Sequence, residues 1–233
     1  MSKIQVYFMP GLAASSLIFE RINLPETFEI HLLEWELPIG EESLKEYAKR
    51  MSEKITVPNP VLIGVSFGGI LVQEMAAFLN PQKVIIISSV KTNLEFPRRM
   101  KIAKSTKAYK LIPTAIFSNM EKLTAFSFGK SIEKRLKLYE RFLSVRDVRY
   151  LDWAIERILL WDRTVADESI IHIHGDADEV FPIKYIQNCI VVKGGTHIMI
   201  LTKYRWLNEN LPDIIRGTFT REKNSTKILK QQK

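Results

Sequence analysis

The sequence predicts an α/β fold in which a mainly parallel sheet is covered by helices. Short, almost wholly apolar runs recur along the chain, which is typical of strands buried on both faces. These runs are Ile4–Met9, Phe28–Leu33, Val61–Val65, Val84–Ser88, Ile170–His174 and Ile190–Val192. Helical patterns lie between most of them, and such alternation indicates a layered α/β domain. At 233 residues the chain can form one sizeable core.

Two amphipathic helices are predicted in the first part of the chain. The first covers residues 41–56, where two glutamates suit a helix N-terminus. Its apolar stripe consists of Leu44, Tyr47, Ala48, Met51 and Ile55. The second helix follows residue 69 and stops at Asn80-Pro81. Its apolar stripe consists of Ile70, Leu71, Met75, Phe78 and Leu79.

The strand–helix alternation stops after Ser89 and resumes at Ser169. Between these points the patterns are helical and rich in aromatic residues. We therefore expect an α/β core made of residues 1–90 and 166–220, with a helical insertion over residues 91–165. Residues 221–233 are polar and basic, and we expect a disordered tail there.

The net charge of +8 is unevenly distributed along the chain. Residues 91–150 hold fifteen Lys and Arg against five Asp and Glu. Such a segment permits contact with nucleic acid or lipid headgroups, but no nucleic-acid recognition motif accompanies it, so a solvated helical face is the simpler interpretation. The apolar run Ile4–Met9 is too short for a signal peptide or a membrane span. The single Cys189 cannot form an internal disulfide, which fits a cytoplasmic location.

Ser66 stands between two glycines where a predicted strand meets a predicted helix. The stretch Gly64-Val65-Ser66-Phe67-Gly68 matches Gly-x-Ser-x-Gly in the strand–turn–helix context that the motif requires. Glycines two residues to either side remove collisions at a very tight turn, and the turn raises the hydroxyl above the sheet. The motif predicts that Ser66 is a nucleophile near a helix N-terminus, where negative charge is favoured.

A serine nucleophile needs a histidine base and an acid that orients it. His31 and His172 lie within apolar strands and His174 ends one, so structural roles are expected for these three. His197 follows the last strand and two glycines, where a loop could bring it to Ser66. Candidate acids at a strand's carboxyl end are Asp176, Asp178 and Glu179. Ser, acid, His is the chain order of one serine-triad fold.

These segments resemble the α/β-hydrolase superfamily over nearly the whole chain. "GVSFGG" looks like the nucleophile elbow, "HGDADEVFP" like the acid loop and "GGTHIMI" like the histidine loop. The resemblance implies a catalytic triad of Ser66, Asp178 and His197. It also implies an oxyanion hole formed by the backbone N–H groups of Leu12 and Phe67, and a helical cap at residues 91–165.

The sequence departs from the superfamily pattern in two places. Many relatives have His-Gly in the first loop, whereas this chain has Met9-Pro10-Gly11. The chain also begins directly on the first strand of this pattern, without the opening hairpin. The resemblance therefore implies an α/β-hydrolase fold trimmed to about six mainly parallel strands.

The predicted function is a serine hydrolase that cleaves a small, largely apolar ester or thioester through an acyl-enzyme. Rival chemistries on the same triad are acyltransferase, lactonase, carbon–carbon bond hydrolase and haloperoxidase; a non-catalytic receptor is a further alternative. We expect no metal, no organic cofactor and no specific nucleic-acid partner. Candidate substrate contacts from the cap are Phe96, Met100, Phe117, Met120, Phe126, Phe128 and Trp153.

Overall fold

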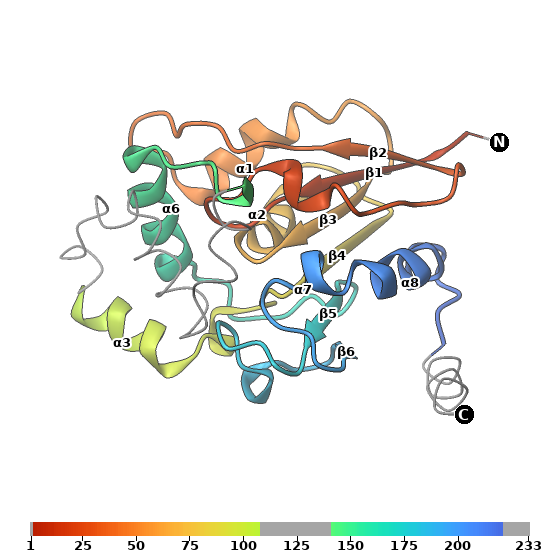
Figure 1. Cartoon of the computed structure of the whole chain (residues 1–233). Helices are drawn as coiled ribbons and strands as arrows, with labels where there is room; N and C mark the ends of the chain where they lie inside the picture. The colour runs from red at the N-terminus through yellow and green to blue at the C-terminus, as the bar shows by residue number, and fades with distance from the viewer. Residues whose placement is uncertain (1, 108–140, 221–233) are drawn as a thin grey trace.

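A computed structural model describes residues 2–107 and 141–220. Its sheet has six strands in the order β2-β1-β3-β4-β5-β6, and every neighbouring pair is parallel (Figure 1). The strands are β1 (Ile4–Met9), β2 (Phe28–Leu32), β3 (Val61–Val65), β4 (Lys83–Ile87), β5 (Ile171–Gly175) and β6 (Ile190–Val192). The predicted fold class is confirmed, and each predicted strand lies within one residue of its observed bounds.

Helices cover both faces of the sheet (Figure 1). On one face, α1 (Leu44–Ser52) contacts α2 (Phe67–Met75). On the other lie the short 3-10 helix η1 (Ser16–Phe19), α7 (Met199–Thr202) and α8 (Tyr204–Arg216). Two further helices, α3 (Arg98–Thr106) and α6 (Val148–Leu160), contact each other at one end of the sheet. Short 3-10 turns occur at η2 (Asn93–Glu95) and η5 (Ile183–Tyr185).

The first helix is shorter than the sequence pattern indicates. Ser43 is its N-cap, and the Ser43 side chain and Glu46 form a reciprocal capping box. This cap fixes the start of α1 at Leu44, so the predicted start at residue 41 was too early. The second helix begins earlier than predicted, at Phe67, because it follows directly from the turn at Ser66.

The central strands β1, β3 and β4 form the middle of the core. Val6, Phe8, Ile63 and Ile85 have no solvent exposure, as expected for strands covered on both faces. Burying each such side chain stabilises the fold by roughly 1.5–3 kcal/mol. The core thus holds the carboxyl ends of β3, β4 and β5 at fixed positions.

The helices α3 and α6 come from the chain between β4 and β5. The residues described between these strands contain no further strand. The boundaries that we assign to the core and the cap remain predictions, and residues 108–140 and the tail at 221–233 lie outside the described parts of the chain.

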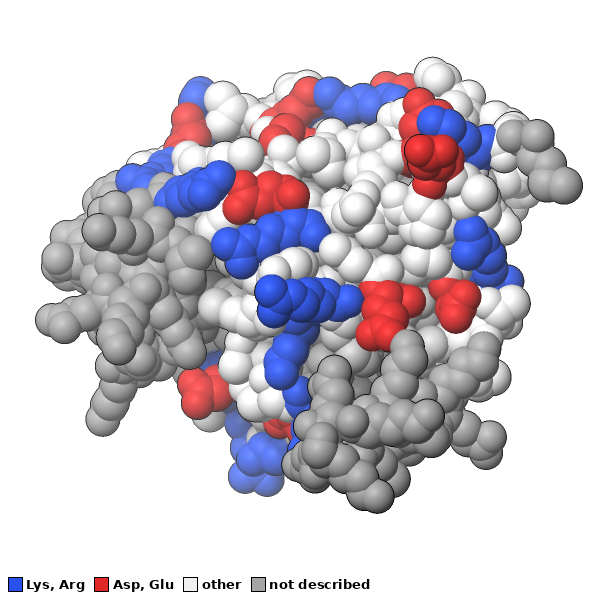
Figure 2. Space-filling view, turned by 45° about the vertical axis from the view of Figure 1, so that its right-hand side comes forward, with Lys and Arg blue, Asp and Glu red and all other residues white. Residues whose placement is uncertain are grey.

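Basic and acidic side chains are interspersed on the surface shown in Figure 2, where Asp and Glu lie among Lys and Arg. Several Lys and Arg side chains adjoin one another down the middle of this face, with Asp and Glu beside them. In the two described ranges, no helix is long and apolar enough to span a bilayer.

Candidate catalytic site

Ser66 occupies the junction between β3 and α2 in a strained backbone conformation. Its φ of 53° and ψ of −119° lie in a region of backbone conformation that residues other than glycine rarely adopt. A Cβ at position 64 would lie 2.2 Å from the Gly68 carbonyl oxygen, and one at position 68 would lie 2.3 Å from the Pro10 carbonyl oxygen. Both glycines are therefore required by close backbone approach.

Backbone hydrogen bonds and one side chain hold the strained turn. The Ser66 N–H donates to the Ile87 carbonyl at the end of β4 (3.0 Å). The Ser66 carbonyl accepts from the Gly69 N–H (2.9 Å) and from the Ser89 hydroxyl (2.7 Å). The neighbouring strand thus fixes the direction in which the Ser66 side chain leaves the sheet.

His197 lies between Ser66 and Asp178 and is hydrogen-bonded to both. Its Nε2 is 3.0 Å from the Ser66 Oγ, and its Nδ1 is 2.9 Å from the Asp178 Oδ2. An ionised carboxylate only accepts, so Nδ1 carries the proton and Nε2 faces the hydroxyl with its lone pair. These three side chains, separated by up to 131 positions in the chain, form one line of hydrogen bonds.

Asp178 is buried, and both of its carboxylate oxygens accept hydrogen bonds. Its Oδ1 accepts the N–H groups of Val180 (2.8 Å) and Phe181 (2.9 Å), while its Oδ2 faces His197. Burial raises the pKa of this carboxyl, but the His197 ring and these hydrogen bonds outweigh burial, so its pKa lies below the ordinary value. Asp178 is therefore ionised near neutral pH.

The two other candidate acids lie elsewhere. Asp176 accepts the Gly194 N–H at 2.6 Å and so holds the loop that carries His197. Glu179 is exposed, and its backbone carbonyl accepts from Arg99. Only Asp178 among the three contacts the histidine.

A second pair of histidines supports the loop that carries Asp178. His174 Nε2 donates to the Phe181 carbonyl (2.8 Å), and its Nδ1 is 3.0 Å from His172 Nε2. Burial lowers the pKa of both rings, and that of His172 most strongly. The neutral pair confirms the structural roles expected for these residues.

Phe181 contacts the candidate catalytic residues, although the sequence pattern did not predict a role for it. Its N–H binds Asp178, its carbonyl accepts from His174, and its ring meets the His197 ring edge-on with centroids 5.5 Å apart. Such a residue carries no chemical group of its own, so no motif search for reactive side chains would find it.

The backbone of Gly11 and that of Phe67 lie beside Ser66, next to which the amides of Leu12 and Phe67 are predicted to act. Phe67 is the first residue of α2, whose opening N–H groups have no partner within the helix. A Cβ at Gly11 would lie 3.1 Å from the Ser66 Cβ, which places the Gly11 backbone against the serine. No described residue accepts a hydrogen bond from either amide.

Three of the seven candidate pocket residues lie in the described part of the chain. Phe96 is buried and stacks on Phe181 (6.1 Å between centroids). Trp153 is buried and packs against Phe67 (6.1 Å), and Met100 is half-buried against the core. The other four, Phe117, Met120, Phe126 and Phe128, lie outside the described residues.

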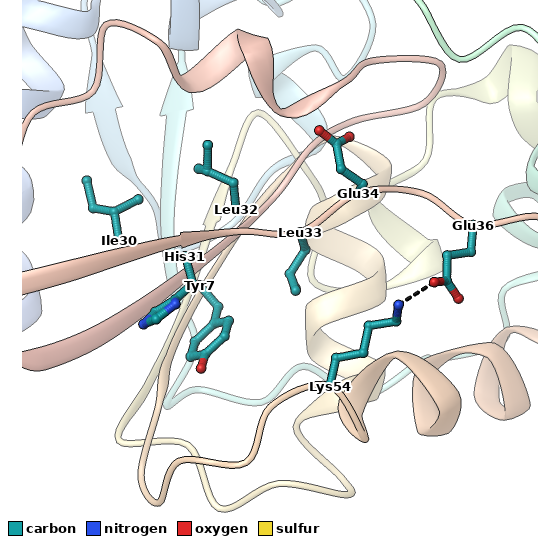
Figure 3. A pocket seen from close by; sticks show the side chains of 8 residues that line it. All are labelled: Tyr7, Ile30, His31, Leu32, Leu33, Glu34, Glu36 and Lys54. Atoms are coloured by element: carbon teal, nitrogen blue, oxygen red, sulfur yellow. Dashed lines mark hydrogen bonds and ion pairs between the residues drawn. The ribbon is translucent and has the colours of Figure 1, made fainter.

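A surface hollow of about 580 Å³ lies at the edge strand β2, away from these side chains (Figure 3). It is lined by Tyr7, Ile30, His31, Leu32, Leu33, Glu34, Glu36 and Lys54. Lys54 pairs with Glu36, and the His31 ring stacks on Tyr7 (4.5 Å). Since none of its lining residues belongs to the line of hydrogen bonds, we do not place substrate there.

Solved structures with the same architecture place the chain in a known fold. A carboxylesterase structure from Nitrososphaera gargenis is 15% identical, covers 93% of this chain and 91% of its own, and has a TM-score of 0.69. A bromoperoxidase from Bacillus anthracis is 17% identical, with 92% of each chain covered and a TM-score of 0.67. An enol-lactonase from Burkholderia xenovorans LB400 is 12% identical, with 93% and 92% covered and a TM-score of 0.66.

The chain has the α/β-hydrolase fold. No protein-family model and no curated protein matches the sequence. In this α/β-hydrolase fold, Ser66 follows β3, Asp178 follows β5 and His197 follows β6. All three side chains come from loops at one edge of the parallel sheet, where open α/β sheets bind ligands. Among the described residues, no group of three or more His, Cys, Asp and Glu side chains could hold a metal ion.

Proposed function

We propose that this protein is a serine hydrolase that cleaves a carboxylic ester or thioester through an acyl-enzyme. The observation that carries the proposal is the unbroken line of hydrogen bonds from Ser66 Oγ through His197 to Asp178, with separations of 3.0 and 2.9 Å. A hydroxyl needs an oriented base of this kind to act as a nucleophile near neutral pH.

In the first half-reaction, the Ser66 oxygen attacks the substrate carbonyl carbon while its proton passes to His197 Nε2. The resulting imidazolium donates from Nδ1 to the ionised Asp178, which stabilises its charge. His197 then gives the proton from Nε2 to the leaving oxygen or sulfur, and the carbon–heteroatom bond breaks. Acylated Ser66 and the free alcohol or thiol result.

In the second half-reaction, His197 takes a proton from water, and the water oxygen attacks the acyl carbon. The proton then returns to the Ser66 oxygen as the acid product leaves. Asp178 keeps the same imidazole tautomer throughout, because its Oδ2 accepts the Nδ1 proton.

We assign stabilisation of the tetrahedral oxyanion to the N–H groups of Leu12 and Phe67. Loss of one such donor typically costs about 3–4 kcal/mol of transition-state stabilisation. The position of Phe67 at the start of α2 adds the positive end of a helix dipole, which favours the developing negative charge.

The substrate side of the proposal is an apolar acyl or aryl group beneath the cap. Phe96 and Trp153 are buried beside the neighbours of His197 and Ser66, respectively, so they could form the walls of such a pocket. A lactone is a cyclic ester and would react by the same steps. The cytoplasmic location suggested by the single cysteine remains a prediction.

A fluorophosphonate probe tests this function directly, because it labels only an activated serine. We expect labelling of the native protein and none of Ser66→Ala or His197→Ala. His31→Ala, at the edge strand β2, is the matched histidine control and should be labelled like the native protein. A series of p-nitrophenyl esters of increasing acyl length would then define the pocket.

A folded native protein that is neither labelled nor able to hydrolyse any ester of the series would contradict the hydrolase proposal. Circular dichroism of each variant provides the folding control. That outcome would favour a ligand receptor with the same fold.

A further inference from the structure

The loop that carries Leu12 has an unusual source of support. Where many proteins of this fold have His-Gly, this chain has Met9-Pro10-Gly11. The Gly11 backbone lies against Ser66, since a Cβ at Gly11 would be 3.1 Å from the Ser66 Cβ and 3.7 Å from its Oγ. The Gly11 carbonyl accepts two hydrogen bonds: one from the Ala14 N–H within the loop (3.1 Å) and one from a side chain that follows β2.

Trp35, which follows β2, makes a buried hydrogen bond to this peptide. Its indole Nε1–H donates to the Gly11 carbonyl at 2.8 Å, and Trp35 as a whole is only 8% exposed. The peptide is planar and trans, so its C=O and N–H groups point in opposite directions. Fixing the Gly11 carbonyl toward Trp35 therefore fixes the Leu12 N–H away from it.

The same ring contacts the residue that carries the second donor. The Trp35 and Phe67 rings are stacked with centroids 4.8 Å apart and planes 9° from parallel. Tyr150 and Tyr47 pack against Trp35 at 5.3 and 6.0 Å, which restricts movement of the indole. The adjacent Glu34 accepts the Ser16 N–H with both carboxylate oxygens. The segment after β2 thus holds the loop at two places.

We propose that Trp35 is a positioning residue for the oxyanion hole. It sets the direction of the Leu12 N–H through the Gly11 carbonyl and supports Phe67 through ring stacking. This inference rests on the hydrolase function proposed above. It assigns to the segment after β2 a role that the superfamily resemblance did not give it.

The alternative is that Trp35 serves only as packing in an aromatic cluster. Replacing Trp35 by 3-benzothienylalanine separates the two roles, because sulfur replaces the N–H while the ring keeps its size and stacking. A residue that only packs would tolerate this change. A residue that orients the peptide would not, because the Gly11 carbonyl would lose its shorter hydrogen bond and keep only the one from the Ala14 N–H (3.1 Å).

We expect the benzothienyl variant at position 35 to lower kcat for a p-nitrophenyl ester about 10- to 100-fold, with KM within about twofold of native. Fluorophosphonate labelling should slow by a similar factor, because it also develops charge on oxygen. The matched control is the same replacement at Trp161, whose Nε1–H donates to the Glu74 carboxylate on α2 (3.1 Å) and not to the loop after β1. The control should keep native kcat.

An unchanged kcat at position 35, or equal losses at both positions, would overturn the inference, as would a change confined to KM. If the benzothienyl variant does not fold, Trp35→Phe decides by the same kcat and KM criteria. If the native protein and the variant at position 35 are equally active, only the proposed role of Trp35 is contradicted. Native protein without activity or labelling contradicts the hydrolase proposal itself.

Discussion

At the scale of single residues, the candidate site depends on a few side chains whose surroundings fix their state. Ser66 holds a strained conformation because β4, Ser89 and Gly69 satisfy its backbone groups. Asp178 stays ionised because donors surround it despite burial. Strain and a buried charge both cost stability, and each is typical of a position kept for chemistry.

The choice between acids yields a prediction at this scale. Asp178→Asn should lower kcat by roughly 10³- to 10⁴-fold, because an amide favours the wrong imidazole tautomer while keeping the shape of the site. Asp176→Asn should stay within a few-fold of native, because the amide oxygen can still accept the Gly194 N–H. Steady-state hydrolysis of one ester checks both.

A similar loss in both variants would mean that the histidine loop, rather than the tautomer, limits the rate. Greater loss in Asp176→Asn than in Asp178→Asn would contradict the assignment of the acid.

At the scale of elements, the elbow depends on how closely three backbone segments approach. The strand β3, the helix α2 and the loop after β1 meet at Gly64 and Gly68, where a Cβ would lie less than 2.5 Å from a carbonyl oxygen. Backbone atoms cannot rotate away as a side chain can. The two glycines therefore determine the packing of these elements.

Gly68→Ala should accordingly destabilise the protein by about 3 kcal/mol or more, at the upper end of overpacking costs. The matched control is Gly40→Ala. Position 40 has a positive φ of 56° but open space around a Cβ, so strain alone should cost about 1–2 kcal/mol. Urea unfolding of the two variants measures the difference. Equal midpoints would contradict steric control at the elbow.

At the scale of the whole molecule, buried neutral histidines make stability depend on pH. His172 and His174 have folded-state pKa values below the ordinary value of about 6.5, whereas the unfolded chain has ordinary ones. Below about pH 6.5 the unfolded state therefore binds more protons than the folded state. Stability is complete above that pH and falls as pH decreases toward the folded pKa values.

Between pH 7 and 5 we expect the free energy of unfolding to fall by at most about 1.4 kcal/mol per pH unit for each of these histidines. His172→Leu should flatten this slope, because it removes the buried ring whose pKa burial lowers most strongly. Urea titrations at several pH values provide the measurement. Equal slopes in the native protein and His172→Leu would contradict the prediction.

Most of the sheet could be predicted from the sequence, because buried parallel strands leave continuous apolar runs. The start of α1 was predicted too early because periodicity does not mark it, whereas the capping-box pattern Ser43-x-x-Glu46 in the sequence does. The proximity of Ser66, Asp178 and His197 was inferred because their sequence motifs resemble those of the α/β-hydrolase superfamily. The contacts of Phe181 and Trp35 escaped prediction because they act through backbone groups that are adjacent only after folding.

The direct pairing of β4 with β5 has a consequence for how this architecture could diversify. β4 ends at Ile87, β5 begins at Ile171, and the two strands are direct neighbours, so the length of the chain that connects them need not alter their separation. For a flexible connection, doubling the length adds only about 0.6 kcal/mol of closure entropy. Replacing the connection between β4 and β5 by one of another length or composition could therefore change which small molecules reach this end of the sheet, while the sheet itself stays the same.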